Sequence, residues 1–301
     1  MSDTSDNASL PKSFLDGLML LFLSVLKEAS KEQELKIWDT FEKEIAHNNR
    51  FFPEAKSVCE ALDFYSKKAV HTLHKGEKTI FRTRLISSME EMPSHTRLIA
   101  DFSDVKFFQE HMREHAVDNE FLKEHAFWGF DSEGSDASPI DKVVAGRINP
   151  TGISYLYASE DPHTAIVEAR PTIEQMVSVA EIELKRDLKL FDFCVDLTDE
   201  NNAESPKRMF EEIARRLSMP NYVGDAGYHA TQYISQYIKK LKDSFDGIRF
   251  RSALHKGGVN IVLFDTTKDD ETKEPLNYAI KNSSIYYVDG ITISAKKVLP
   301  I

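Results

Sequence analysis

Three side chains that could take part in chemistry lie close together in the segment GRINPTGISYLYASEDPHTAIVEARP, residues 146–171. Arg147 lies in a turn, Tyr157 near the end of the predicted strand that follows, and Glu168 on the next predicted helix. Strand ends and the helices beside them are common positions for binding and catalytic residues. The alternative is structural: Arg147 and Glu168 form a surface ion pair and Tyr157 belongs to the core. Taken alone, the segment slightly favours this structural interpretation.

Two other segments carry further candidates. In FRTRL, Arg82 and Arg84 are two positions apart on a predicted strand, so their side chains point to the same face. If that face is the inner one, two charged side chains there require a ligand or a partner. Ser252 ends another predicted strand, and Asn260 follows in a glycine-containing turn. No base is evident for Ser252, so we do not interpret it as a nucleophile.

Other kinds of site find little support in the sequence. His111 and His115 are four residues apart and would share one face of a helix, but no third ligand is indicated, so a solvated face is the favoured interpretation. We therefore expect no metal site. The chain contains no GxSxG, Walker A or GxGxxG motif.

The candidates must be positioned by a chain of mixed elements. Residues 11–74 have a helical pattern, with one apolar stripe of Leu35, Trp38, Phe41 and Ile45 and a second of Val58, Leu62, Tyr65 and Ala69. Asp161 and Pro162 predict the cap and first position of a short helix that Pro171 ends. The remaining expectations are strands at 79–87, 153–159, 177–184, 188–196, 245–253 and 259–264, helices at 104–125, 205–220 and 227–243, an exposed, mobile loop at 131–139, and a closing hairpin at 284–299 around Asp289-Gly290.

Strands that are mostly antiparallel, with helices between them, predict an α+β fold rather than a doubly wound sheet. We divide the chain into an N-terminal helical module, residues 1–77, and a second domain, residues 78–301. The apolar run Gly17 to Leu26 is too short to span a bilayer, and we expect a helix buried on most sides or one that forms a dimer interface.

Composition limits the partners. The chain has 301 residues, 41% of them hydrophobic, and its net charge is −11, from 38 basic and 49 acidic residues. An acidic protein does not attract nucleic acid, although a local basic pocket for a small anion remains compatible with this charge. Cys59 and Cys194 form no CxxC pair, which is typical of two buried thiols in a reducing compartment. We expect a cytoplasmic protein that binds neither nucleic acid nor membrane.

Taken together, FRTRL, the segment 146–171 and FDGIRFRSALHKGGVNIVLF resemble the RES domain, over roughly residues 78–270. The resemblance implies a fold similar to that of ADP-ribosyltransferases and an enzyme that consumes NAD as its substrate, with no resident cofactor. It also implies site residues: Arg82, Arg147, Tyr157, Glu168 and Ser252. RES domains are known as toxins that an Xre-like antitoxin neutralises, so the resemblance implies a toxin or defence role and a partner of that kind. The N-terminal module and the insertion between Arg82 and Arg147 depart from the compact toxins.

The implied chemistry suits these side chains. Arginine guanidinium groups can hold the phosphates of NAD, and Arg84 is the alternative to Arg82 for this role. Glu168 can stabilise the oxocarbenium-like state formed when nicotinamide leaves. Tyr157 can stack on a ring, and Ser252 and Asn260 can orient the ribose or a phosphate. We expect hydrolysis or phosphorolysis of NAD, with a protein ADP-ribosyltransferase or a non-enzymatic NAD sensor as alternatives.

Overall fold

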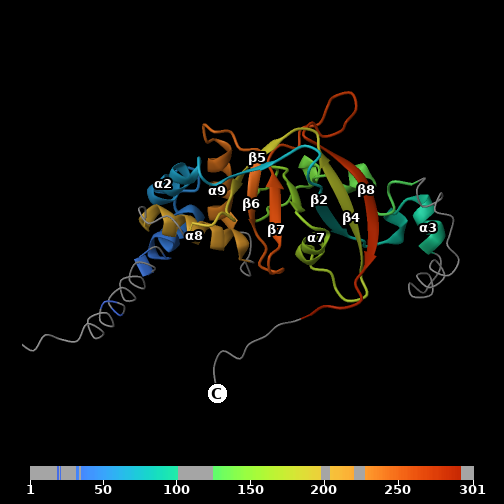
Figure 1. The fold of residues 1–301 in the computed structure, drawn as a ribbon, viewed down its shortest axis with the longest axis horizontal. Helices are drawn as coiled ribbons and strands as arrows, with labels where there is room; N and C mark the ends of the chain where they lie inside the picture. The colour runs from blue at the N-terminus through green and yellow to red at the C-terminus, as the bar shows by residue number, and fades with distance from the viewer. Residues whose placement is uncertain are drawn as a thin grey trace, which may run out of the picture.

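The computed structural model describes residues 19, 21, 32, 33, 35–100, 125–197, 204–219 and 228–292, and it has an α+β fold (Figure 1). Residues 35–47 are helical. The labelled helices are α2 (Lys56–Tyr65), α3 (Ser94–Ala100), α6 (Ser132–Ser135), α7 (Pro162–Glu168), α8 (Glu204–Ser218) and α9 (His229–Lys239), with 3-10 turns at Met89–Glu91 and Ile140–Lys142. The strands are β1 (Val70–Leu73), β2 (Ile80–Leu85), β3 (Leu156–Ser159), β4 (Met176–Leu184), β5 (Leu188–Asp192), β6 (Gly247–Arg251), β7 (Val259–Leu263) and β8 (Tyr278–Tyr287).

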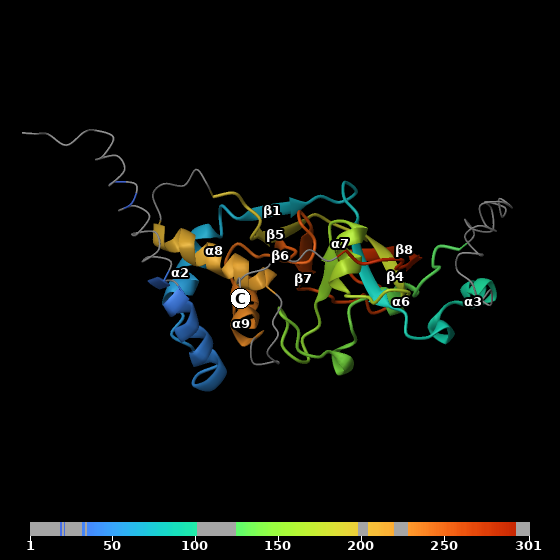
Figure 2. The same cartoon turned by 90° about the horizontal axis from the view of Figure 1, so that it is seen from below.

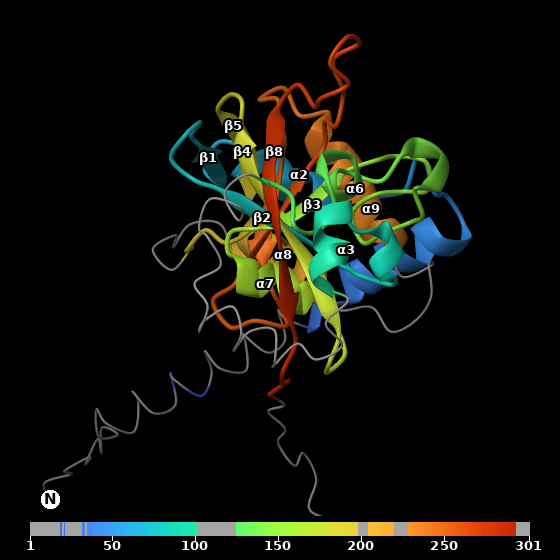
Figure 3. The same cartoon turned by 90° about the vertical axis from the view of Figure 1, so that its right-hand side faces the viewer.

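The strands form one sheet in the order β1-β5-β6-β7-β3-β2-β4-β8. The neighbours pair antiparallel except β5 and β6, which are parallel. Figures 1 and 2 show α2, α8 and α9 grouped at one end of the sheet, whereas α7 lies apart from them and packs on β2. Seen from the opposite end, β8 runs along the near edge of the sheet (Figure 3). The predicted fold class and the mostly antiparallel pairing are confirmed.

Apart from Leu35, which is half-buried, the residues of the two predicted apolar stripes in the N-terminal region are buried, and they share one core with α8 and α9. Trp38, Phe41 and Ile45 are 2% exposed or less, and so are the stripe residues of α2. They pack in the cluster that also contains Phe210 and Ile213 of α8. The core therefore continues across residue 77, the boundary that the sequence suggests. In addition, residues 70–73 were expected to be helical but form β1, because they pair with β5 from Val70–Phe191 to Leu73–Leu188.

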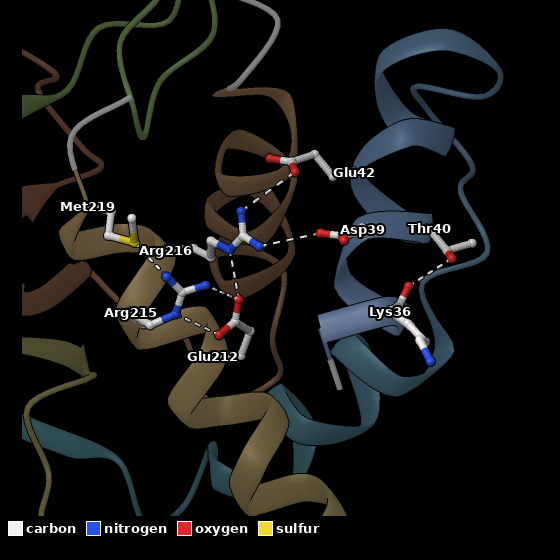
Figure 4. Close-up of polar contacts among 8 residues, drawn as sticks. All are labelled: Lys36, Asp39, Thr40, Glu42, Glu212, Arg215, Arg216 and Met219. Atoms are coloured by element: carbon white, nitrogen blue, oxygen red, sulfur yellow. Dashed lines mark hydrogen bonds and ion pairs between the residues drawn. The ribbon is translucent and has the colours of Figure 1, made fainter. Parts of the chain in front are cut away.

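Arg216 joins α8 to the helix of residues 35–47 on the protein surface (Figure 4). Its guanidinium contacts Asp39 at 3.5 Å and Glu42 at 3.7 Å, and it lies 5.2 Å from the ring of Trp38. Within α8, Glu212 accepts hydrogen bonds from both Arg215 and Arg216. Polar contacts thus supplement the apolar core between these two helices.

The segment predicted as a loop at residues 131–139 is exposed at its two ends, as expected, but the expectation of exposure was wrong for residues 135–137, which are buried. It contains α6, and Ser135 and Asp136 are 2% and 1% exposed. The Tyr278 hydroxyl donates to Asp136 Oδ1 at 2.6 Å, and Lys268 Nζ lies 2.8 Å from Asp136 Oδ2. Asp136, in a segment whose composition suggests a surface loop, is thus buried with hydrogen-bonding partners on β8 and nearby, whereas Asp131 and Ser135 bond within or beside the segment itself.

Some expectations concern residues outside the described ranges. The predicted helix at 104–125, including His111 and His115, lies there apart from its last residue. The same holds for most of Gly17 to Leu26, of which Met19 and Leu21 are described and are 66% and 63% exposed. At the other end, β8 pairs with β4 along its length, and the second arm of the predicted hairpin falls mostly on residues 293–301, which are not described.

Candidate active site

A cavity of about 370 Å³ lies where β2 and β3 separate. These strands pair only at Phe81 and Ser159, whereas β2 pairs with β4 from Ile80 to Leu85. The cavity opens beside this single pair. Its walls come from β2, β3, β6, β7 and α7, together with Arg147 and Tyr228. Of the predicted site residues, it brings together Arg82, Arg147, Tyr157, Glu168 and Asn260.

Helix α7 places Glu168 at the cavity wall. As predicted, Asp161 caps the helix: its Oδ1 accepts a hydrogen bond from Thr164 N at 2.8 Å, and Pro162 follows at the first position. Glu168 is the last residue of the helix. The chain then turns at Arg170, whose φ of 52° ends the helical conformation before Pro171. The cap and the stop are thus both local, and together they fix where the carboxylate lies.

The two oxygens of the Glu168 carboxylate have different surroundings. Oε1 accepts hydrogen bonds from Ser252 Oγ at 2.7 Å and from Asn260 Nδ2 at 2.6 Å. Oε2 accepts none from the part of the chain that the structure describes. Ser252 does not line the cavity, and its Oγ also accepts hydrogen bonds from the backbone N–H groups of Leu254 and His255, each at 3.1 Å. Those two donors direct the serine proton toward Glu168.

The loop that carries Arg147 is attached to α9 by side chains. Thr231 Oγ1 donates to the Arg147 carbonyl at 2.6 Å, Gln232 Nε2 to the Gly146 carbonyl at 2.8 Å, and Ser235 Oγ to the Ile148 carbonyl at 2.6 Å. Thr231, Gln232 and Ser235 lie on one face of α9, so this helix determines the path of the loop.

The guanidinium of Arg147 faces the end of α8. Its Nη1 donates to the carbonyl of Leu217 at 2.7 Å and to that of Ser218 at 3.3 Å. Its Nε is buried and has no hydrogen-bond partner among the described residues. A helix C-terminus attracts a cation, because its last carbonyl groups are not used within the helix. Arg147 does not pair with Glu168, in contrast to the structural alternative considered for this segment.

Tyr157 lines the cavity, and its hydroxyl bonds to the loop that carries Arg147. The hydroxyl donates to Asn149 Oδ1 at 2.7 Å and accepts from Ile148 N at 3.1 Å. Burial raises the pKa of Tyr157 to about 12. A Cβ on Gly146 would lie 2.8 Å from this hydroxyl and 2.4 Å from Asn149 Oδ1, so a larger residue there would displace the two groups that bond to each other.

Arg82 and Arg84 point to the same face of β2, but they have different partners. Arg82 lines the cavity and donates from Nη1 to the Tyr157 carbonyl at 3.0 Å. Arg84 donates from Nη2 to the Asp136 carbonyl at 2.7 Å and does not line the cavity. The burial of Arg82 and, to a smaller extent, the nearby positive charge of Arg84 lower the pKa of Arg82 to about 10. Arg82 therefore remains protonated at neutral pH. The cavity thus keeps a positive charge from β2.

A comparison with protein families finds that residues 114–282 match the RES domain. This range covers more than half of the chain and contains the cavity residues Arg147, Tyr157, Glu168 and Asn260. The chain belongs to the RES domain family. Arg82 and Arg84 precede the matched range. No curated protein and no solved structure matches the chain.

The cavity of this RES domain also has walls that the sequence did not suggest. Phe81, Phe250 and Tyr228 add aromatic surface, and Ser159 lies beside Asn260. Phe250 pairs with Asn260 across β6 and β7, so strand alternation places it on the same face. Phe250 could have been predicted as a cavity residue from the sequence if β6 and β7 had been assumed to pair. Tyr228 precedes α9, and no sequence pattern indicated that it approaches the cavity.

Within the described ranges, the RES domain protein has no group of three or more His, Cys, Asp or Glu residues suited to a metal ion. None of its described helices is long and apolar enough to cross a bilayer. The thiols of Cys59 and Cys194 are free and partly buried, and burial raises the pKa of both.

Proposed function

We propose that this RES domain protein is an enzyme that cleaves the bond between nicotinamide and ribose in NAD. The observation that supports this most directly is the Glu168 carboxylate, which is held at Oε1 by Ser252 and Asn260 while the side chain lines the cavity. The volume of the cavity lies within the range of about 300–1,000 Å³ that is typical of small-molecule sites. NAD is the substrate, and the proposed chemistry uses no resident cofactor.

Cleavage of this bond passes through a state in which positive charge develops on the ribose, as in glycoside hydrolysis. A fixed carboxylate beside the ribose stabilises that charge, and it does so best when it need not reorient during the reaction. The two hydrogen bonds to Oε1 hold Glu168 in place, so Oε2 is the oxygen that faces the ribose. Nicotinamide leaves as a neutral ring and requires no general acid.

Arg147 and Arg82 supply positive charge at the same cavity, in a protein whose net charge is −11. Guanidinium groups bind phosphate oxygens bidentately, so these arginines are the groups we assign to the pyrophosphate. Tyr157, Phe81 and Phe250 offer ring surfaces on which nicotinamide can stack. Arg84 has no part in this arrangement.

Transfer of the ADP-ribose to a protein would use the same carboxylate and the same arginines, and the acceptor distinguishes the two reactions. Water gives ADP-ribose, inorganic phosphate gives its phosphorylated form, and a protein acceptor becomes labelled. The toxin or defence role, the Xre-like partner and the homodimer that the sequence suggests remain predictions.

The test is incubation of the purified protein with NAD labelled in its adenylate part, with and without phosphate, followed by identification of the products. We expect release of nicotinamide and of free ADP-ribose or its phosphorylated form. The Glu168→Gln variant is the matched control, because a glutamine oxygen can still accept from Ser252 and Asn260. We expect its rate to fall about a hundredfold or more, with the melting temperature close to that of the wild type. Intact NAD after incubation with the wild type would refute the proposal.

A further inference from the structure

Glu168 is connected to a buried serine that has no assigned role. Ser159 Oγ donates to Asn260 Oδ1 at 2.9 Å, and Asn260 Nδ2 donates to Glu168 Oε1 at 2.6 Å. The three side chains form one line of hydrogen bonds from β3 through β7 to the end of α7. Ser159 is 2% exposed and Asn260 7% exposed, so water hardly competes for these contacts.

The backbone holds this line in register. Ser159 and Asn260 are direct partners across the antiparallel strands β3 and β7, so their side chains leave the same face of the sheet. Ser159 is also the residue through which β3 pairs with Phe81 of β2, at the point where these strands separate. The serine is thus attached on both sides at the edge of the cavity.

We propose that Ser159 is a positioning residue that acts on Glu168 through Asn260, an inference that rests on the function proposed above. An amide side chain rotates easily about its last bond, because that torsion has a broad energy profile. The hydroxyl of Ser159 restrains the oxygen end of the Asn260 amide, which aims the nitrogen end at Glu168. A chain of hydrogen bonds also polarises its members, which strengthens the bond to the carboxylate.

Loss of the serine hydroxyl removes the donor that Asn260 Oδ1 accepts from. The amide then samples other orientations, and the Glu168 carboxylate keeps only the hydrogen bond from Ser252 in a fixed direction. Because catalysis by a carboxylate depends on its orientation toward the reacting carbon, the effect falls on kcat. Binding of NAD through Arg147 and Arg82 does not involve this line, so KM changes little.

The test is a double-mutant cycle in NAD consumption with Ser159→Ala, Asn260→Ala and the double variant. We expect Ser159→Ala to lower kcat about fivefold and to leave KM within about twofold. In the Asn260→Ala background, the serine substitution should change kcat by less than about twofold, because the residue that transmits its effect is absent. Losses in kcat that multiply in the double variant would overturn the inference.

Ser178→Ala is the matched control. Ser178 is equally buried, lies on β4, and accepts one hydrogen bond, from Phe130 N at 2.9 Å. Its removal should lower the melting temperature but leave kcat unchanged, and an equal loss of kcat would count against a specific role for Ser159.

If Ser159→Ala does not fold, the variant Ser159→Cys keeps a weak hydrogen-bond donor at that position, and we expect a kcat between those of the wild type and Ser159→Ala. A wild-type kcat in Ser159→Cys would overturn the inference. An inactive wild type would refute the proposed function itself, whereas an active wild type with independent losses refutes only the positioning role.

Discussion

At the scale of single residues, Tyr157 shows how a site residue can act through its surroundings. Tyr157 lines the cavity, but its hydroxyl lies between Ile148 N and Asn149 Oδ1, both in the loop that carries Arg147. The hydroxyl therefore helps to hold the loop. A role in proton transfer to the substrate would require the same hydroxyl to leave these partners.

The Tyr157→Phe variant separates the two roles. We expect a loss of about 1–3 kcal/mol in the free energy of unfolding, because Ile148 N–H and the Asn149 amide lose a buried partner. A higher KM for NAD should accompany this loss as the Arg147 loop loosens, whereas kcat changes little. Denaturant unfolding and steady-state kinetics measure these quantities, and a large fall in kcat at unchanged stability would indicate a chemical role instead.

The same residue has a consequence for pH dependence. The pKa of Tyr157 is raised by burial to about 12, whereas a tyrosine in an unfolded chain ionises near about 10. Its contribution to stability is therefore fully present below about pH 10 and is lost as the pH rises through the folded-state pKa. It stays protonated throughout an assay at neutral pH, so the rate profile should contain no step from this group.

At the scale of elements, the last turn of α8 connects the site to the N-terminal region. On one side, Leu217 O and Ser218 O accept hydrogen bonds from Arg147. On the other side, Arg216 contacts Asp39 of the helix of residues 35–47 (Figure 4). The orientation of the α8 carbonyls toward Arg147 thus depends on how firmly this turn is supported.

Arg215 and Arg216 offer a controlled comparison. Both bind Glu212, but only Arg216 also reaches Asp39 and Glu42 on the other helix, since Arg215 bonds to Glu212 and Met219 of its own turn. Exposed ion pairs contribute about 0.2–1 kcal/mol each. We expect Arg216→Ala to raise KM for NAD about two- to fivefold if most of this energy is transmitted to Arg147. Arg215→Ala should leave KM near the wild-type value. Equal changes in both variants would show that the turn is supported within α8 alone.

The elements also show how far the sequence could predict the site. Asp161, Pro162 and Pro171 encode α7 locally, so the position of Glu168 at the end of a short helix was predictable. Strand alternation correctly placed Arg82 and Arg84 on one face, but it could not choose between them. Which of the two arginines lines the cavity depends on where β2 separates from β3 and on the position of Asp136. Asp136 is buried, although the residues around it have the composition of an exposed loop. Tertiary packing decides both.

At the scale of the whole molecule, the RES domain does not contain its entire core. The family match begins at residue 114, whereas Trp38, Phe41, Leu62 and Tyr65 pack with side chains of α8 in a single cluster. β1 completes the edge of the sheet beside β5. The N-terminal region therefore packs against α8, whose last turn binds Arg147, and so forms part of the structure that supports the site.

This shared core gives the last prediction, which tests the boundary suggested at residue 77. A fragment of residues 78–301 should not fold on its own, because Phe210, Ile213 and Leu217 would lose the apolar side chains that cover them. Each buried side chain of this kind contributes about 1.5–3 kcal/mol, and several together are comparable to the typical stability of about 5–15 kcal/mol. Co-expression of residues 1–77 with 78–301 should restore a complex that melts cooperatively and consumes NAD, as gel filtration, calorimetry and the product assay would show. A monomeric 78–301 fragment with the melting temperature of the full chain would instead establish it as an autonomous domain, since only a core complete in itself can survive the loss of β1 and α2.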